Sequence, residues 1–507
     1  MRLREFLALQ EVEEAEGNLD QEVTGLTYDS RQVRAGEIFF AIPGEKLDGH
    51  EFIPRALESG AAGVVVAHKA SWPQGTTWIR TKDVRRTMGL WGAHFYGRPS
   101  RRMKLVGVTG TNGKTTVAYL VESILSAAGL EPGVVGTINY RYRGRHVPSH
   151  HTTPESLELQ SLLAEMETAG AQSVVMEVSS HALVQDRVRG IDFDVGIFTN
   201  LSRDHLDYHA SMDDYFSAKS KLFTDYLKVS VKPKKAAVIY AEDARGRELL
   251  DKLRDSGLET WSYGEDSEWD IHPVTVQSDV AGLRGQLEFK GRHLDFSSPL
   301  LGAANLQNIM GAVGVGGCLE LPANVIAKGI QQLTSVPGRL EKVENNLGVS
   351  VLVDYAHTPD ALEKVLGAVR PLTQRRVLTV FGCGGDRDRG KRPLMGEIAA
   401  RLSDLLVLTS DNPRTEDPLR ILAEIENGIQ KSGLKKFGDD SPQTERGYWV
   451  EKDRRAAIRI GLRAAQRGDL VLIAGKGHED YQILGAKKIH FDDREVAREE
   501  LSRIGSA

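Results

Sequence analysis

The stretch VGVTGTNGKTT at residues 106–116 predicts a buried strand, a glycine-rich turn and the start of a helix. Glycines let backbone N–H groups turn toward an anion, and the positive end of the following helix attracts the same anion. Lys114 can reach terminal phosphates, and the Thr115 hydroxyl can ligate magnesium. The match to the phosphate-binding loop is incomplete, because Val108 stands at its first glycine position and Gly110 lies inside the loop. A glycine-rich turn with a solvated lysine is the alternative interpretation.

Length and composition exclude several classes of protein. A chain of 507 residues is too long for one core and suggests about three domains. A formal net charge of -5 argues against a general nucleic-acid binder, and two cysteines, Cys318 and Cys383, indicate a reducing compartment. No stretch approaches the roughly 18 apolar residues of a membrane span, and the N-terminus lacks the apolar core of a signal peptide. We therefore expect a cytoplasmic protein with no nucleic-acid partner and no membrane insertion.

Three blocks follow one another along the chain. Residues 1–98 mix short strands with helical stretches, and the polar segment 97–102 is a linker candidate. Residues 99–336 alternate helices with apolar strands, which is typical of a parallel sheet covered on both faces, and residues 337–507 repeat this alternation. The expected strands are 37–42, 63–66, 173–178, 194–198, 351–353, 376–380, 405–408 and 469–473. The fold class is therefore α/β with three domains.

Polar residues follow several of these strands, and ligands of open α/β sheets bind at the carboxyl ends of strands. Glu177 closes a strand and could hold a metal ion, although such a residue alone is more often a solvated carboxylate. The dense polar segment 200–209 suits a ligand site, but any single histidine in it is as often structural. Lys219 lies in the amphipathic helical pattern 215–223, and that pattern alone favours a surface lysine.

Taken together, the motifs resemble the Mur ligase family over essentially the whole chain. The matching segments are 109–116 (TGTNGKTT), 151–154 (HTTP), 176–181 (MEVSSH), 200–209, 218–219, 302–308 (GAANLQN), 337–339 (PGR), 354–359 (DYAHTP) and 382–387 (GCGGDR). The resemblance implies an ATP-dependent amide-bond ligase with a small N-terminal α/β domain, a central P-loop ATPase-type domain with a parallel sheet and a C-terminal Rossmann-like domain. Within the family, the chain most resembles the ligases that add the third peptide residue to the cytoplasmic peptidoglycan precursor. Residues 411–414 (DNPR) resemble the form that uses meso-diaminopimelate.

The resemblance also implies three sets of binding residues. The precursor UDP-N-acetylmuramoyl-L-alanyl-D-glutamate (UDP-MurNAc-L-Ala-D-Glu) would contact Ser30, Lys46, Thr152, Thr153, Ser179, Gln185 and Arg187. ATP would contact Gly110, Thr111, Asn112, Gly113, Lys114, Thr115, Thr116, Asn305, Arg339 and Asp354. The incoming amino acid would contact Arg387, Asp411, Asn412, Arg414, Gly475 and Glu479. His151 departs from the asparagine common in related sequences, and we assign it no role.

Two magnesium ions are implied by the same resemblance. Thr115 and Glu177 would hold the first, and His205 would hold the second together with Lys219, carbamylated by carbon dioxide to N6-carboxylysine. The expected catalytic residues are Lys114, His205, Lys219 and Arg339. The expected mechanism phosphorylates the D-glutamate side-chain carboxylate to an acyl phosphate, which the amine of the amino acid then attacks. We expect a monomer.

Two rival functions remain at this point. One is a related ligase that adds lysine at the same position or glutamate to a folate; residues 411–414 and the UDP-binding type of N-terminal block argue against each. The other is an ATP-binding regulatory module or NTPase switch that hydrolyses without ligation, which the amino-acid-site motifs of the third block disfavour. The discriminating observation is whether ADP release requires both the UDP-precursor and an amino acid.

Overall fold

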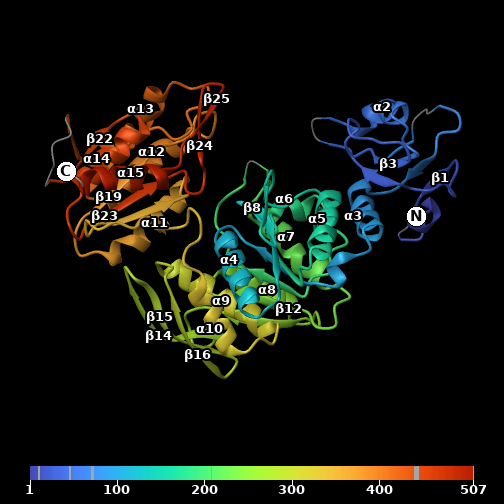
Figure 1. Cartoon of the computed structure of the whole chain (residues 1–507), viewed down its shortest axis with the longest axis horizontal. Coiled ribbons are helices and arrows are strands. Elements are labelled where there is room, and N and C mark those ends of the chain that lie inside the picture. Colours follow the sequence, from blue (N-terminus) through green and yellow to red (C-terminus); the bar gives the residue numbers. More distant parts are fainter. Residues whose placement is uncertain (10–11, 45–46, 70–72, 207, 439–444, 506–507) are drawn as a thin grey trace. The chain divides into compact units, whose positions relative to one another are not determined.

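A computed structural model describes residues 1–9, 12–44, 47–69, 73–206, 208–438 and 445–505 (Figure 1). The chain forms two compact units. The first contains residues 1–272, 288–293 and 308–329, and the second contains 273–287, 294–307 and 330–507. Within the described ranges, no helix has both the length and the apolar character that crossing a membrane requires.

The N-terminal block is built on a five-stranded sheet with the order β1-β5-β4-β3-β2. Strands β2 to β5 run parallel, and β1 pairs antiparallel with β5 at the edge. Strand β4 is buried along its whole length, as its Gly-Val-Val-Val sequence predicts. The elements are α1 (Leu3–Leu7), β1 (Glu14–Glu16), β2 (Gly25–Thr27), β3 (Glu37–Phe40), η1 (Gly49–Phe52), α2 (Ile53–Glu58), β4 (Gly63–Val66), β5 (Trp78–Arg80) and α3 (Val84–Phe95).

The central sheet has β6 (Lys104–Thr109) in its middle, and the strands β13-β12-β11-β6-β10-β7, in this order, run parallel to one another. The other parallel strands are β7 (Pro132–Val135), β10 (Ser173–Glu177), β11 (Val195–Phe198), β12 (Ala236–Tyr240) and β13 (Glu259–Tyr263). The helices are α4 (Lys114–Ala127), α5 (Ser156–Thr168), α6 (Ser180–Val184), α7 (Met212–Lys221), α8 (Ala244–Leu253), α9 (Ala303–Cys318) and α10 (Ala323–Gln332), with a π-helical turn η3 (Leu222–Leu227) after α7.

Further strands extend this region beyond the core of the predicted parallel sheet. Strands β8 (Asn139–Tyr142) and β9 (Arg145–Pro148) form a hairpin on β7, and all four residues of β9 are exposed. Most residues of β14 (Ile271–Asp279), β15 (Gly282–Phe289) and β16 (Arg292–Ser298) belong to the second unit. The parallel-sheet prediction was thus correct for the core strands and incomplete for these additions.

The C-terminal sheet has the order β17-β18-β23-β19-β20-β22-β21 and is parallel except for the pair β17–β18. Alternate side chains of its central strands enter two separate apolar clusters, so both faces are covered as predicted. The strands are β17 (Glu341–Lys342), β18 (Ser350–Asp354), β19 (Val377–Phe381), β20 (Leu405–Leu408), β21 (Lys435–Lys436), β22 (Gly447–Val450) and β23 (Leu470–Ala474). The helices are α11 (Pro359–Val369), η4 (Arg370–Leu372), α12 (Lys391–Leu402), α13 (Pro418–Gln430), α14 (Arg454–Ala464) and α15 (Asp493–Gly505), and β24 (Tyr481–Leu484) pairs with β25 (Lys487–His490) in a separate hairpin.

The segment predicted as a linker is firmly held. It contains a short 3₁₀ turn, η2 (Pro99–Arg101), and the side chain of Ser100 is buried. The Ser100 Oγ accepts a hydrogen bond from the backbone N–H of Asp192 at 3.1 Å. The segment therefore joins the two blocks without being a solvated hinge, and the domain boundaries at residues 98/99 and 336/337 stay a prediction.

Candidate active site

The turn between β6 and α4 has the geometry of a phosphate-binding loop. Gly110 and Gly113 adopt φ values of 146° and 86°, in the region that favours glycine. A Cβ at Gly110 would lie only 1.9 Å from the Thr199 Oγ1, so no larger residue fits there. The Nζ of Lys114 donates to the carbonyl oxygens of Gly110 and Thr111, each at 2.9 Å. The N-terminus of α4 and the Lys114 side chain are therefore positioned to bind an anion.

The polar segment after β11 holds the phosphate-binding loop in place through hydrogen bonds. The backbone N–H of Thr111 donates to the Asn200 carbonyl at 3.0 Å, and that of Asn112 donates to the Asn200 Oδ1 at 2.9 Å. The Thr199 hydroxyl donates to the Asn112 carbonyl at 2.6 Å. Part of the predicted polar cluster therefore positions the loop backbone.

Glu177 lies at the centre of a network of hydroxyl groups beside the loop. The Thr115 Oγ1 donates to the Glu177 Oε2 at 3.2 Å. The Thr137 N–H donates to the Glu177 Oε1 and the Thr137 hydroxyl to the Oε2, each at 3.0 Å. Glu177 is 2% exposed, so the interpretation as a solvated carboxylate was wrong. These oxygen atoms are the kind of ligand that magnesium prefers.

Thr137 was missed by the sequence reasoning, although a signal for it exists. It follows Gly136 just beyond the carboxyl end of β7, the position at which ligand-binding residues of such sheets gather. A Cβ at Gly136 would lie 2.6 Å from the Glu177 Oε1. The glycine thus leaves room for the carboxylate.

Lys219 points into the protein. Its side chain is 1% exposed, and its Nζ donates to the Gly110 carbonyl at 2.7 Å. Burial lowers the pKa of Lys219 well below its usual range, and the charge of Lys114 lowers it further, while Asp204 opposes the shift. The surface interpretation was wrong, because the face of α7 that carries Tyr215 and Lys219 packs inward.

His205 belongs to the same neighbourhood and is more exposed. Its side chain is 44% exposed, and its backbone adopts a φ of 53°. Its ring lies 5.9 Å from the Tyr215 ring, and the Lys219 Nζ lies 4.5 Å from that ring. Tyr215 is thus a common neighbour of the two residues predicted to share a metal ion.

Five of the predicted precursor-binding residues adjoin the Glu177 network. The Thr152 and Thr137 hydroxyls share a hydrogen bond of 3.1 Å, and the Thr153 hydroxyl donates to the Glu177 carbonyl at 2.8 Å. Three further residues are connected to these threonines. The Ser179 N–H donates to the Thr153 hydroxyl, and the Arg187 guanidinium donates to the Thr153 carbonyl and to the Gln185 side chain. Ser30 is buried in the N-terminal block, where no described contact joins it to this cluster, and Lys46 lies outside the described residues.

Asn305, Arg339 and Asp354, predicted to contact ATP, belong to the second unit and are described within it. Asp354 accepts hydrogen bonds from the backbone N–H groups of Leu340 and Ala356, at 2.8 and 2.9 Å. Burial raises the pKa of Asp354, and Arg339 opposes this shift. The Arg339 guanidinium lies 5.1 Å from the centre of the Tyr355 ring. The buried Asn305 donates to the Leu301 carbonyl within the same unit.

A second polar cluster surrounds Lys476 in the C-terminal block. The Nζ of this buried lysine lies 3.3 Å from the Asn412 Oδ1, 3.2 Å from the Glu479 Oε2 and 3.5 Å from the Asp411 Oδ1. The Asn412 amide also donates to the Glu479 Oε2 at 2.9 Å. Three predicted amino-acid-binding residues are thus brought together by Lys476, to which the sequence analysis assigned no role.

The hairpin of β24 and β25 holds the loop that contains Arg414. The backbone N–H of Arg414 donates to the Ile483 carbonyl at 3.1 Å, and the Gly485 N–H donates to the Arg414 carbonyl at 2.8 Å. The Ile483 N–H donates to the Asn412 Oδ1 at 3.0 Å. Sequence reasoning missed this hairpin, whose strand β25 is wholly exposed.

The remaining amino-acid-site residues lie around the same loop. The Arg414 guanidinium donates to the Gly385 carbonyl at 2.8 Å, and Arg387 is exposed two residues farther along the chain from Gly385. Gly475 has a φ of 120°, and a Cβ there would approach the Asp411 carboxylate to 3.8 Å. Two guanidinium groups and two carboxylates therefore belong to one region of the C-terminal block.

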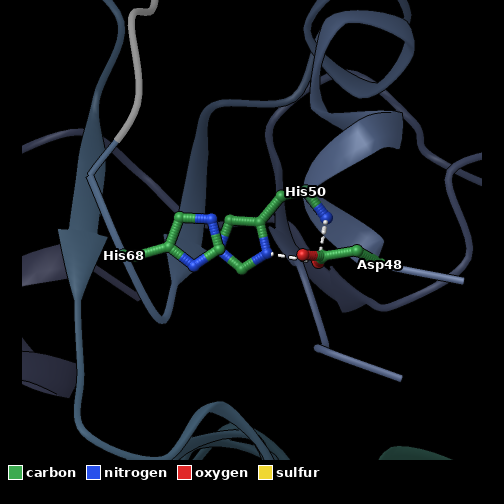
Figure 2. A group of neighbouring side chains, drawn as sticks. All are labelled: Asp48, His50 and His68. Atoms are coloured by element: carbon green, nitrogen blue, oxygen red, sulfur yellow. Dashed lines mark hydrogen bonds and ion pairs between the residues drawn. The ribbon is translucent and has the colours of Figure 1, made fainter. Parts of the chain in front are cut away.

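Asp48, His50 and His68 also form a group, in the N-terminal block (Figure 2). The His50 Nε2 accepts a hydrogen bond from the Ala67 N–H at 3.1 Å, so its Nδ1 carries the proton and donates to Asp48 at 2.6 Å. The two imidazole rings are stacked, with centroids 3.9 Å apart and an interplanar angle of 14°. Because imidazole lone pairs lie in the ring plane, parallel rings do not direct them at one ion. Through the hydrogen bond between His50 and the Ala67 N–H, this group connects the turn at residues 48–50 to Ala67.

Three sequence models of one family match the chain. The model described as "Mur ligase middle domain" matches residues 108–316, and the "Mur ligase, glutamate ligase domain" matches 338–477. A third, "Mur ligase family, catalytic domain", matches residues 22–89.

Individual proteins match over the full length. The UDP-N-acetylmuramoyl-L-alanyl-D-glutamate--2,6-diaminopimelate ligase of Geobacter metallireducens is 49% identical, with 100% of both chains covered. The enzyme of the same name from Geobacter sulfurreducens is 49% identical, with 98% of each chain covered. A solved structure of an enzyme with this name superposes with a TM-score of 0.74 at 31% identity, covering 100% of this chain and 99% of the other.

Proposed function

Because the chain belongs to the Mur ligase family, whose members use ATP, we propose that it catalyses the reaction of MurE enzymes. It joins meso-diaminopimelate to the D-glutamate of UDP-MurNAc-L-Ala-D-Glu during peptidoglycan precursor synthesis. The observation that carries this proposal is the 49% identity, over the whole of both chains, to a ligase named for these two substrates.

The reaction needs an activated carboxylate, because a carboxylate does not react with an amine at neutral pH. An oxygen of the D-glutamate side chain attacks the γ-phosphorus of ATP, the bond to the β-phosphate oxygen breaks, and ADP leaves. The amine of diaminopimelate, having lost its proton, then attacks the acyl carbon and inorganic phosphate leaves. The protein must stabilise charge in the first step and exclude water in the second.

The loop residues suit the first step. Backbone N–H groups at the start of α4 and the Lys114 ammonium bind the phosphates and stabilise the negative charge that builds during transfer. The hydroxyls of Thr115 and Thr137 and the Glu177 carboxylate form an oxygen-rich set that would hold one magnesium ion. Bound magnesium supplies positive charge that lessens repulsion between the phosphates and the attacking carboxylate.

Lys219 is suited to carbamylation. Only a neutral amine adds carbon dioxide, and burial favours the neutral amine here. The amine nitrogen would form a bond to the carbon of carbon dioxide and release a proton to solvent, which would leave an anionic carbamate beside the Gly110 backbone and Lys114. It would hold a second magnesium ion together with His205.

The C-terminal cluster suits an amino acid with charges at both ends. Arg414 and Arg387 carry guanidinium forks that match carboxylates, and Glu479 matches an ammonium group. Lys476 holds Glu479 and Asn412 in place and balances part of the negative charge. The far carboxylate of diaminopimelate thus has a partner that lysine could not use, which disfavours the lysine-adding alternative.

The proposal includes a cytoplasmic site of action, where ATP and the nucleotide-linked precursor are made, and a monomeric enzyme. A ligation assay with UDP-MurNAc-L-Ala-D-Glu, ATP, magnesium and a panel of amino acids tests the function. We expect ADP release only when both the precursor and meso-diaminopimelate are present. Release of ADP without an amino acid product would favour the NTPase switch, and a glutamate product formed when a folate replaces the precursor would favour the other ligase.

A further inference from the structure

A cavity of about 530 Å³ lies in the first unit, apart from the residues discussed above. Its four walls are one side of α3 from Arg86 to Ala93, the turn at 98–101, the turn at 189–192 and the chain at 224–231, and Leu9 also lines it. Strands β6 and β11 begin just after the two turns, so the cavity lies at the amino ends of these parallel strands. The phosphate-binding loop and Asn200 follow the carboxyl ends of the same strands. The cavity is therefore distinct from the candidate ATP site.

The walls of the cavity are fixed to one another by close contacts. A Cβ at Gly89 in α3 would lie 2.6 Å from the Arg189 Cβ, and one at Gly190 would lie 2.7 Å from the Ala93 Cβ. The Asp192 carboxylate accepts hydrogen bonds from the Arg101 Nε at 2.9 Å and from the Val231 N–H at 3.0 Å. Hydrogen bonds or close packing thus connect all four walls, and the fold itself defines the space between them.

The charge of the lining is predominantly positive. Four arginines, Arg86, Arg98, Arg101 and Arg189, face only two carboxylates, Asp192 and Asp225. Arg101 is paired with Asp192, and Arg189 is paired with Asp186 at 2.6 Å. Within the described part of the chain, the guanidinium groups of Arg86 and Arg98 have neither an ion-pair partner nor a hydrogen-bond acceptor. Arg98 is a half-buried residue and Arg86 is exposed, so an anion can reach both guanidinium groups and give each a charge-assisted hydrogen bond.

The rest of the lining is apolar. Leu90 and Ile191 form part of the wall together with Tyr226. Val229 and Val231 are 64% and 60% exposed, which is unusual for large aliphatic side chains. The volume lies within the range of pockets that bind small molecules, roughly 300–1,000 Å³. The ligand class that fits has an apolar body and one anionic group.

We propose that this cavity binds a small organic anion, a carboxylate or phosphate on an apolar body, held by Arg98 and Arg86. The geometry of the guanidinium fork favours oxyanions, and the valines cover the apolar part. Neither guanidinium serves the ligation reaction proposed above, so the site and the reaction can be tested separately.

The probe is 1-anilinonaphthalene-8-sulfonate, an aromatic body with one sulfonate, and its fluorescence is titrated with the full-length protein in the presence of saturating magnesium-ATP. Its uncharged counterpart, N-phenyl-1-naphthylamine, reports binding of the apolar body alone. We expect Arg98→Met and Arg86→Met each to weaken sulfonate binding by about 10-fold or more, the loss typical of a charge-assisted hydrogen bond. Arg98→Lys keeps the charge and should weaken binding less. Arg467→Met, which removes an exposed arginine of the C-terminal block, is the matched control and should bind the probe as the unmodified protein does.

Three results would overturn the proposal. They are unchanged probe affinity in both methionine variants, equal binding of the uncharged counterpart, and probe binding that is seen without magnesium-ATP but is absent when magnesium-ATP is saturating. Thermal unfolding midpoints are measured for every variant. If Arg98→Met does not fold, Arg86→Met and Arg98→Lys still decide the outcome.

Discussion

Two substitutions of Lys219 distinguish its proposed role as a carbamylated metal ligand from its contribution to the packing of the buried side chains. The side chain is buried, and its Nζ donates a hydrogen bond to the Gly110 carbonyl, which also accepts one from Lys114. Lys219→Ala leaves a cavity, and such changes cost about 2–5 kcal/mol of unfolding free energy. Lys219→Met keeps most of the volume and should cost about 1.5 kcal/mol or less. The methionine variant therefore tests function with the fold nearly unchanged.

We expect both variants to lose at least about 100-fold in kcat/KM, the loss typical of removing one preorganised group that stabilises transition-state charge. The variants should differ in rescue. Acetate or formate can occupy the space left by alanine and partly restore activity, whereas methionine fills that space and should prevent rescue. Lys221→Met, two residues along the same helix, is the control and should remain active.

The assay is single-turnover formation of ADP and product, with urea unfolding to measure stability. Incubation with ¹³C-bicarbonate should give a carbamate signal in NMR spectra of the unmodified protein that both Lys219 variants lack. Near-normal turnover by a folded Lys219→Met protein would refute a chemical role for this lysine. Equal rescue of both variants by acetate would refute the carbamate explanation.

Other changes test the remaining parts of the site. Lys114→Ala and His205→Ala should greatly slow acyl phosphate formation, while the UDP-precursor should still bind in calorimetric titrations. A normal single-turnover rate in either variant would contradict the role proposed for that residue. Lys476→Met leaves the buried Asp411 carboxylate and the half-buried Glu479 carboxylate without their cation, so urea unfolding should show a loss of about 3–5 kcal/mol, and the KM for meso-diaminopimelate should rise more than that for ATP. Burial lowers the pKa of His478 to about 4, so the unfolded chain binds more protons between pH 4 and 6.5, and stability falls as pH drops through this window. His478→Gln should remove at most about 3 kcal/mol of that pH dependence, and an unchanged difference in unfolding free energy between pH 7 and pH 4.5 would contradict the shift.

The core strands were predictable because buried parallel strands are continuous apolar runs. Gly63–Val66 and Leu405–Leu408 have the predicted bounds. The hairpins β8–β9 and β24–β25 were not predicted, because their outer strands are exposed and carry no apolar pattern. An exposed strand is defined by its hydrogen-bonded neighbour, which the local sequence does not reveal.

The candidate site was predictable in its residue types and only partly in its environment. The rule that ligand sites follow strand ends found Glu177, but its burial depends on Thr137, 40 residues away in the sequence. Lys219 is buried against Gly110, 109 residues away, so the helical pattern around it suggested a surface position. Contacts between residues so distant in sequence arise only when the sheet brings strand ends together.

Lys476 illustrates the same limit in the C-terminal block. A lysine between two glycines suggests a solvated loop, and the sequence shows no reason for burial. Its partners Asn412 and Asp411 lie more than 60 residues earlier in the chain, after a different strand. The ion pairs that stabilise the buried ammonium therefore become visible only in the fold.

The most direct test of the central claim is the ratio of kcat/KM for meso-diaminopimelate to that for lysine, measured in the unmodified protein and in Arg414→Ala. Lysine lacks the far carboxylate, so in the proposed site it would leave the guanidinium of Arg414 without a ligand partner. We predict discrimination on the order of 10⁴-fold in the unmodified protein and a much smaller ratio in the variant. Equal use of the two amino acids by the unmodified protein would contradict the proposed specificity.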